Sequence, residues 1–203
     1  MSTTDGYGQG ISLASLTDAP DIPKAISDLA AGVIPRTAMR FASATTRGAT
    51  ITSPVAGMLA WLNDVGLLTV YDGSTWVVVA SGVRAWTTVA LASGWSQNGN
   101  SQGSLQYRIV NLFGEDTIML RGGISRASYP GSMPDHFTIN NTLLPAAARP
   151  GTLRTIVVPC SDVGSDRIAL KLDIATTGEL NLFGTSNTAK PAWVGFNGCF
   201  ASL

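Results

Sequence analysis

The sequence PVAGMLAWLNDVGLLTVYDGSTWVVVA, residues 54–80, contains three short apolar runs separated by two turns. We expect each run to form a β-strand, at 57–62, 67–71 and 75–80. The Asp72-Gly73 pair between the last two runs is typical of a type I′ hairpin turn, whose two central residues need positive φ. A three-stranded meander of this size buries little apolar surface, so it needs another domain or further copies of itself to be stable.

The composition favours an all-β chain. Charged residues make up 13% of the 203 residues, against roughly 25% in an average soluble domain. Only two glutamates and three lysines are present, whereas these residues normally coat exposed helices. The formal net charge is zero, no apolar run is long enough to cross a bilayer, and the N-terminus has no secretory-signal pattern. We therefore expect no nucleic-acid partner and no membrane insertion.

The N-terminal part predicts a flexible segment followed by one helix. Residues 1–20 are rich in glycine and serine and are expected to order only on a partner. Residues 21–53 predict a short helix and a linker, with Asp21 as N-cap and with Gly32 and Pro35 ending the helix near residue 31. The apolar side chains of this helix form one narrow stripe, Ile22, Ile26, Leu29 and Val33. The stripe fits packing on the helix's own domain or a seam where three copies meet about an axis.

After the meander, taken as residues 54–83, the pattern changes to a series of β-runs over residues 84–203. Alternation of apolar and polar residues predicts strands at 105–112, 117–124, 153–160, 166–175, 179–183 and 193–202. Segments rich in Gly, Asn, Ser and Pro predict loops at 94–103, 126–152 and 184–192. Alternation on this scale implies two sheets around a shared core, so we expect a jelly-roll-like β-sandwich head domain.

Several motifs resemble those of small tail-tip, minor tail and fibre proteins of tailed bacteriophages. The segments PKAISDLA, RFAS, ATTRGATITSPVAGMLAWL and VYDGSTWV are similar to the N-terminal part of these proteins. Members of the family repeat a proline, a glycine before an apolar strand, and a YDGS-T-W motif, here Pro54, Gly57, Tyr71, Asp72, Gly73, Ser74, Thr75 and Trp76. The segments LPAAARP, IALKLDIATTGELNL and WVGFNGCFAS, at 144–150, 168–182 and 193–202, resemble the distal domain of fibre or receptor-binding proteins. Fibres of phage-derived contractile injection systems use the same parts.

The resemblance implies a homotrimeric virion protein of the phage tail or tail tip. In such a protein the N-terminal segment docks on other tail or baseplate proteins, and the C-terminal head faces the host cell. We accordingly expect an oligomer interface formed by Ile22, Ile26, Leu29, Trp61, Tyr71 and Trp76. The alternative is a purely structural tail or capsid-decorating protein that binds no receptor.

Catalytic chemistry has little support in the residues. The single histidine, His136, follows Asp135, but no GxSxG elbow accompanies it, so a loop residue or a surface hydrogen-bonder is the favoured interpretation. The carboxyl pairs Asp162 with Asp166 and Glu115 with Asp116 could be drawn as glycosidase pairs of a depolymerase, yet turn chemistry explains them better. We expect a protein without enzymatic activity and without a cofactor.

The two cysteines, Cys160 and Cys199, could pair if their strands are neighbours. Buried free thiols are the favoured interpretation, because the chain has no secretory signal. Two cysteines and one histidine do not complete a zinc site without carboxylates, so we expect no metal.

A glycan-binding site is the remaining hypothesis. Trp95 lies in ASGWSQNGNSQG, among amide and hydroxyl side chains, and Tyr129 lies in RASYPGSMP. A sugar ring stacks its C–H face on an aromatic ring while its hydroxyls bond amides. The candidate ligand residues are Trp95, Asn98, Asn100 and Tyr129, for a host cell-surface saccharide. Alternatively, Trp95 fills the edge of the sandwich core or a subunit contact.

Overall fold

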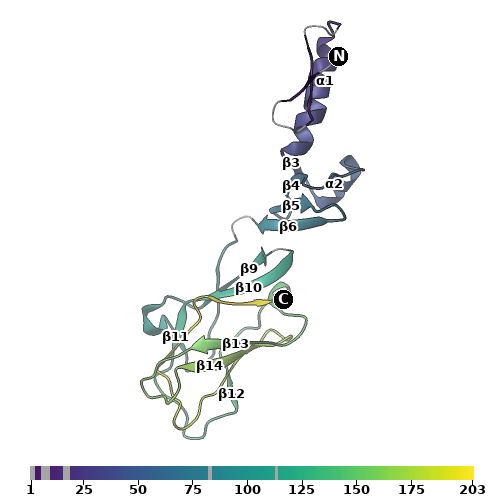
Figure 1. Ribbon diagram of the computed structural model, residues 1–203. Coiled ribbons are helices and arrows are strands. Elements are labelled where there is room, and N and C mark those ends of the chain that lie inside the picture. The colour runs from purple at the N-terminus through teal and green to yellow at the C-terminus, as the bar shows by residue number, and fades with distance from the viewer. Residues whose placement is uncertain (1–2, 6–9, 16–18, 82–83, 113) are drawn as a thin grey trace. The chain divides into compact units, whose positions relative to one another are not determined.

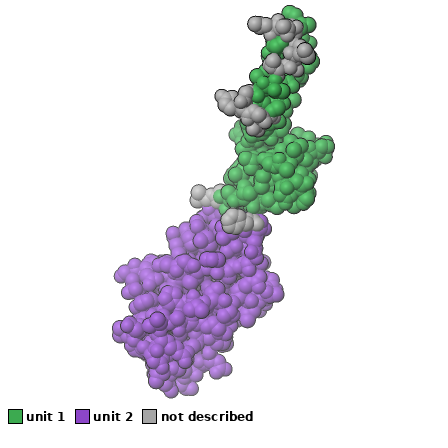
Figure 2. Space-filling view, in the orientation of Figure 1, with its two compact units in different colours: residues 1–82 green, residues 83–203 purple. Residues whose placement is uncertain are grey.

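The computed structural model describes residues 3–5, 10–15, 19–81, 84–112 and 114–203 (Figure 1). The chain divides into two compact units, residues 1–82 and 83–203, coloured green and purple in Figure 2. Strands predominate, and the one long helix lies near the N-terminus, so the expected all-β class with a short N-terminal helix is confirmed. In the described part of the chain, no helix is both long and apolar enough to cross a membrane.

Helix α1 (Ile22–Val33) begins where the sequence predicts. The side chain of Asp21 accepts a hydrogen bond from the Lys24 N–H at 2.9 Å and so caps the first turn. One turn on, the Lys24 ammonium and the Asp28 carboxylate form an exposed ion pair at 2.6 Å. The helix continues two residues beyond the expected end, into a 3₁₀ turn η1 (Ile34–Arg36).

Gly32 does not end helix α1 but makes room for a neighbouring segment. Strand β1 (Thr3–Thr4) pairs antiparallel with β2 (Ser12–Leu13), and Ile11 lies against the helix. A Cβ at Gly32 would lie 2.7 Å from Cγ2 of Ile11, so a larger residue would push the two apart. The described residues of the expected flexible segment thus form a short ladder; residues 1–2, 6–9 and 16–18 of that segment lie outside the described residues.

Unit 1 contains a sheet with one strand more than the meander. The three expected strands are present as β4 (Leu59–Leu62), β5 (Leu67–Tyr71) and β6 (Trp76–Ser81), and β3 (Ala38–Phe41) pairs parallel to β4. Helix α2 (Ala44–Thr50) connects β3 towards β4, and Ser43 caps it by accepting from the Thr46 N–H. The linker expected before residue 54 is therefore wrong for 38–50, because a four-residue strand and a seven-residue helix are too short to show a clear period.

The hairpin between β5 and β6 has a four-residue loop instead of a type I′ turn. Tyr71 pairs with Trp76, so residues 72–75 form the loop. Of Asp72 and Gly73, the expected central residues of the turn, only Gly73 has positive φ, at 108°. The Asp72 carboxylate accepts from the N–H groups of Ser74 and Thr75, both at 2.8 Å. These hydrogen bonds lower the pKa of Asp72, and the bond from the Thr75 N–H has the largest effect. The aspartate therefore closes the loop with its side chain, an arrangement that needs no positive φ at its own position.

Arg47 of α2 fastens the helix to the sheet. Its side chain is only 8% exposed. The Arg47 Nη1 donates to the Thr69 hydroxyl at 2.8 Å, and the guanidinium carbon lies 4.2 Å from the ring centroid of Trp76. Thr69 in turn donates to the Ala60 carbonyl at 2.9 Å. Within the described residues no carboxylate forms an ion pair with Arg47, and desolvation lowers its pKa. The ring and the hydroxyl thus replace a counter-ion.

The expected interface residues of the meander divide between the two faces of this sheet. Tyr71 and Trp76, with ring centroids 5.5 Å apart, share the face of Thr69, which α2 covers. Trp61 pairs with Leu68, and alternation along the strands places both on the opposite face. Trp76 is therefore committed to a contact inside its own unit, whereas Trp61 faces away from α2.

We expect Arg47→Ala to lower the local stability of unit 1 by roughly 2–3 kcal/mol, because it removes the cation–π contact, a hydrogen bond and the packing of the side-chain stem. Native-state hydrogen exchange of the β5 and β6 amides in the full chain measures this change. Arg40→Ala, on the opposite face and exposed, is the matched control, with an expected change within about 0.5 kcal/mol. Slower exchange in Arg47→Ala would mean that the unpaired charge costs more than its contacts contribute.

Unit 2 is built from three antiparallel sheets, not from the two that the sequence predicts. Their strand orders are β17-β10-β9-β7, β16-β11-β8 and β12-β15-β14-β13. The strands are β7 (Thr87–Thr88), β8 (Ser96–Gln97), β9 (Gln106–Leu112), β10 (Glu115–Arg121), β11 (Gly123–Ser125), β12 (His136–Thr138), β13 (Arg154–Pro159), β14 (Ala169–Ile174), β15 (Leu180–Phe183), β16 (Trp193–Gly195) and β17 (Cys199–Ser202). Short 3₁₀ turns lie at η2 (Gly99–Ser101) and η3 (Ala146–Ala148).

One apolar core joins the three sheets. Inward side chains of every sheet belong to it, among them Ile118, Leu120, Ile124, Val158, Leu172, Leu182, Val194 and Phe196. Each of the six predicted strands overlaps an observed one. The segment expected as a loop at 126–152 nevertheless contributes strand β12 and the buried residues Ile139, Leu144 and Ala148. This segment therefore carries part of the core, although its glycines and prolines hide the alternation.

Candidate functional site

Trp95, the central residue of the predicted glycan site, belongs to the core of unit 2. It is 8% exposed and lies just before β8. Its ring meets that of Tyr129 edge-on, with centroids 6.4 Å apart at 88°, and that of Phe137 at 5.9 Å and 83°. The alternative interpretation, that Trp95 fills the edge of the sandwich core, describes its position. An exposed stacking face for a sugar is absent at Trp95.

Tyr129 and Phe137 complete what we call the aromatic cluster, Trp95, Tyr129 and Phe137. The Tyr129 and Phe137 rings are 5.9 Å apart at 72°. The phenol of Tyr129 donates to the Pro191 carbonyl at 2.8 Å, which ties two loops together. Phe137 comes from β12, within the segment expected as a loop, and sequence analysis did not single it out. The alternating residues of HFTIN at 136–140 were the available signal.

A guanidinium covers the aromatic cluster. The Cζ of Arg126 lies 5.1, 5.4 and 4.5 Å from the ring centroids of Trp95, Tyr129 and Phe137. The Nε of Arg126 donates to the Ser128 carbonyl at 3.0 Å, and its backbone N–H donates to the Ala192 carbonyl at 3.1 Å. Several cation–π contacts and one hydrogen bond thus fix this side chain in one position.

Glycine at position 94 is required by this arrangement. Gly94 has φ of 85°, and a Cβ built there would lie 3.0 Å from both terminal nitrogens of Arg126. A side chain at this position would be strained and would crowd the guanidinium. Gly94, directly before the buried Trp95, therefore allows the Arg126 guanidinium to take its position over the aromatic cluster.

The two predicted asparagines have local roles in their loop. Asn98 and Asn100 are both exposed and have positive φ, 66° and 53°. The Asn98 side-chain oxygen accepts from the Gly103 N–H at 2.8 Å, which closes the turn around η2. In the described residues no hydrogen bond links either asparagine to the aromatic cluster. The structure thus brings Trp95 and Tyr129 together, but it gives the asparagines no contact with them.

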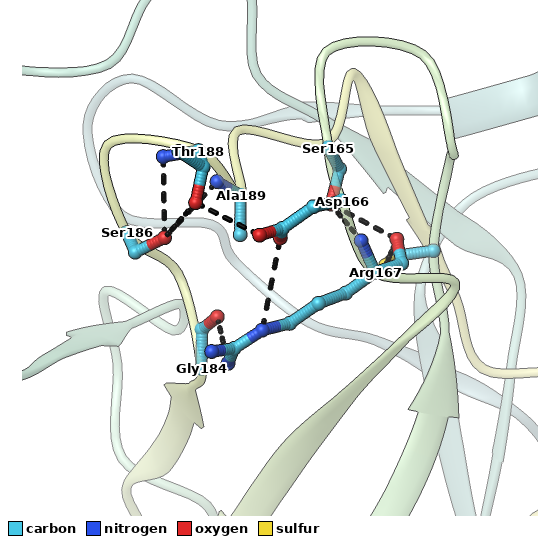
Figure 3. Close-up of polar contacts among 8 residues, drawn as sticks. Ser165, Asp166, Arg167, Gly184, Ser186, Thr188 and Ala189 are labelled. Carbon is cyan, nitrogen blue, oxygen red and sulfur yellow. Dashed lines mark hydrogen bonds and ion pairs between the residues drawn. The ribbon is translucent and has the colours of Figure 1, made fainter.

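A second group of polar residues joins two loops of unit 2 (Figure 3). Asp166 accepts from the Thr188 hydroxyl at 2.9 Å and lies 3.8 Å from the Arg167 Nε. The Arg167 Nη1 donates to the Gly184 carbonyl at 2.7 Å. The Ser186 hydroxyl accepts from the N–H groups of Thr188 and Ala189. Asp166, one of the carboxylates considered for glycoside cleavage, thus holds the loops together.

His136 lies on the edge strand β12 and is exposed, so the expectation of a loop is wrong, whereas the expectation of a surface position agrees with the structure. Its ring stacks on Phe183, with centroids 4.9 Å apart at 30°, and the Lys171 Nζ lies 3.9 Å from the same ring. Among the described residues, no group of three or more His, Cys, Asp or Glu side chains could hold a metal ion. Cys160 and Cys199 are free thiols, as expected, the first buried and the second half-buried.

The pKa of Tyr129 is raised to about 12, because burial disfavours the phenolate. The folded-state pKa exceeds the ordinary value of 10.0, so the contribution of Tyr129 to stability is complete below pH 10 and is lost as the pH rises through about 12. We expect ultraviolet titration of the full chain to show a late-ionising tyrosine that is absent in Tyr129→Phe. A difference curve between the two proteins that titrates near pH 10.0 would contradict the described burial.

The chain is similar to solved structures but matches no family model. No protein-family model matches the chain, and no curated protein matches it. Among solved structures, 59% of this chain is similar to the receptor-binding protein (gp15) of Listeria phage PSA, with a TM-score of 0.43 and 11% sequence identity. The match spans 65% of that chain. Similarity this low transfers neither fold nor function.

Proposed function

We propose that the chain is a non-enzymatic component of a phage virion, a trimeric tail-fibre or tail-tip protein. Its N-terminal part attaches to the tail or baseplate, and its C-terminal β-sandwich binds a host cell-surface receptor. The exposed apolar stripe of α1 is the observation that carries the proposal. The phage motifs of the sequence support it, from PKAISDLA through VYDGSTWV.

The stripe exposes an unusual amount of apolar surface for a helix of twelve residues. Ile22, Ile26 and Leu29 are 72%, 63% and 46% exposed, and no residue of α1 is buried. An apolar groove of about 250 Å³ runs beside the stripe, between α1 and β2, with Leu13 on its far side. Covering such side chains stabilises an assembly by about 25 cal/mol per Å² of apolar area. Three copies meeting about an axis would bury the whole stripe.

Receptor binding by unit 2 is supported by the loops around the aromatic cluster. Loops carry recognition when a rigid scaffold positions them, and here hydrogen bonds from Tyr129 and Arg126 to residues 191 and 192 hold two loops on the sandwich. Tyr129 is half-buried, so one edge of the cluster reaches the surface. A saccharide is the receptor class that fits polar loops beside an aromatic edge.

The second candidate, a purely structural tail or capsid-decorating protein, is favoured by one observation. Trp95 is buried in the core and does not present a stacking face. A protein whose aromatic residues serve only its own packing would need no receptor.

We expect the full chain to form a trimer of 21.1 kDa subunits, and Ile26→Asp to dissociate it, because a carboxylate in the seam would have to lose its water. Size-exclusion chromatography with light scattering measures the mass. Ser27→Asp, with the same new charge on the adjacent exposed position, is the matched control and should remain trimeric. A wild-type monomer at micromolar concentration would contradict the trimer.

Receptor binding is tested with the full chain on an array of bacterial surface polysaccharides and on intact bacterial cells. We expect saturable binding to a subset of glycans, and binding to those bacteria that display them. A protein with no binding to any glycan or cell, while still trimeric, would support the structural alternative.

A further inference from the structure

Arg126 lies over three aromatic rings, whereas Arg108 and Arg121 of the same unit both lie over one, that of Trp86. Arg167 is held by polar groups: one terminal nitrogen bonds the Gly184 carbonyl, and its Nε faces the Asp166 carboxylate (Figure 3). Arg126 has no carboxylate within ion-pair distance among the described residues. Its guanidinium forms cation–π contacts with three aromatic rings instead.

Both terminal nitrogens of Arg126 are available to a ligand. In the described part of the chain neither Nη1 nor Nη2 of Arg126 has a hydrogen-bond partner, since the hydrogen bond of its side chain is donated by Nε. Among the described residues, the fully buried side-chain nitrogens without a hydrogen-bond partner belong to Arg47 and Arg108, and no nitrogen of Arg126 is among them. Its two Nη groups therefore reach solvent from a side chain that is otherwise half-buried.

The surroundings of Arg126 prepare it for binding. A free arginine side chain loses about 2 kcal/mol of rotamer entropy when a ligand fixes it. At Arg126 the rings and the Ser128 carbonyl have already fixed the side chain, and Gly94 packs closely against the guanidinium, where a Cβ would crowd it. A preorganised planar fork matches the two oxygens of a carboxylate or a phosphate group.

The neighbouring groups add no competing negative charge. Tyr129 keeps its proton at neutral pH, and its hydroxyl is already used in the bond to Pro191. Trp95 and Phe137 offer only apolar and ring surface. An anionic group that binds here would thus contact the Arg126 guanidinium beside apolar rings. Its charge interaction with the guanidinium is stronger there than in bulk water.

We propose that Arg126, supported by the aromatic cluster, binds one anionic oxygen group of the receptor, through paired hydrogen bonds from its two terminal nitrogens. The receptor would then be an acidic polysaccharide, carrying carboxylate or phosphate groups, rather than a neutral one. This inference rests on the proposed receptor-binding function for the identity of the polymer, but the anion site itself does not depend on it.

The test is isothermal titration of the full chain with sodium glucuronate, glycerol phosphate and glucose. We expect wild-type protein to bind at least one of the two anions, with an affinity that falls as sodium chloride is added, and to bind glucose more weakly. Glucuronate and glycerol phosphate separate a carboxylate from a phosphate receptor. Arg126→Gln removes the charge and should abolish anion binding.

Two further variants separate binding from folding. Arg126→Lys keeps the charge over the rings but loses the fork, and should weaken anion binding about tenfold. Arg167→Lys is the matched control, because its donors are used inside the protein, and it should bind as wild type does. Retained anion binding in folded Arg126→Gln, or no anion binding by wild type, would overturn the proposal.

The outcome is distinguishable from failure of the proposed function. Arg126-dependent anion binding by a protein that adsorbs to no cell and no polysaccharide would support the site and contradict receptor binding. Adsorption that is unchanged in Arg126→Gln would support receptor binding and overturn the claim that Arg126 binds the receptor's anionic group.

Discussion

Arginine placed against an aromatic ring is the interaction on which both units depend. In unit 1, Arg47 lies between α2 and the sheet, over Trp76, and without it the helix would lack its buried attachment. In unit 2, Arg126 covers three rings where two loops meet the sandwich. In the described residues neither Arg47 nor Arg126 forms an ion pair with a carboxylate. Ring quadrupoles take over that role, and they cost less desolvation than a second buried charge.

Trp95 and Trp76 both use their rings for contacts inside their own units. A tryptophan in a loop of a low-charge β-protein suggests a stacking surface for a sugar. The ring of Trp95, however, already contacts Tyr129, Phe137 and Arg126 within unit 2. Trp76 is similarly engaged by Arg47 and Tyr71. The side chain of Arg126 is half-buried, and the apolar stripe of α1 in unit 1 is exposed. We propose recognition by charge at the first and assembly by apolar contact at the second.

Sequence predicted the strands best where one face is buried, because alternation then carries the signal. Strand β14 shows it, with Leu170, Leu172 and Ile174 buried and Lys171 exposed. The same rule fails for β3 and α2, which are too short to display a period, and for Gly32, whose role depends on Ile11 twenty-one positions earlier in the chain. For the candidate site, the sequence named Trp95 and Tyr129 but not Arg126 or Phe137. These four residues meet only through tertiary contacts, and their spacing carries no local pattern.

In the proposed function the N-terminal part assembles on the particle and the β-sandwich is presented to the host. An electron cryo-microscopy reconstruction of the assembled virion tests this arrangement. We expect threefold density at the tail or baseplate, with α1 at the axis against other virion proteins and the loops around Arg126 exposed to the exterior. Density that places the Arg126 loops inside a protein–protein contact, or α1 away from any neighbouring copy, would contradict it.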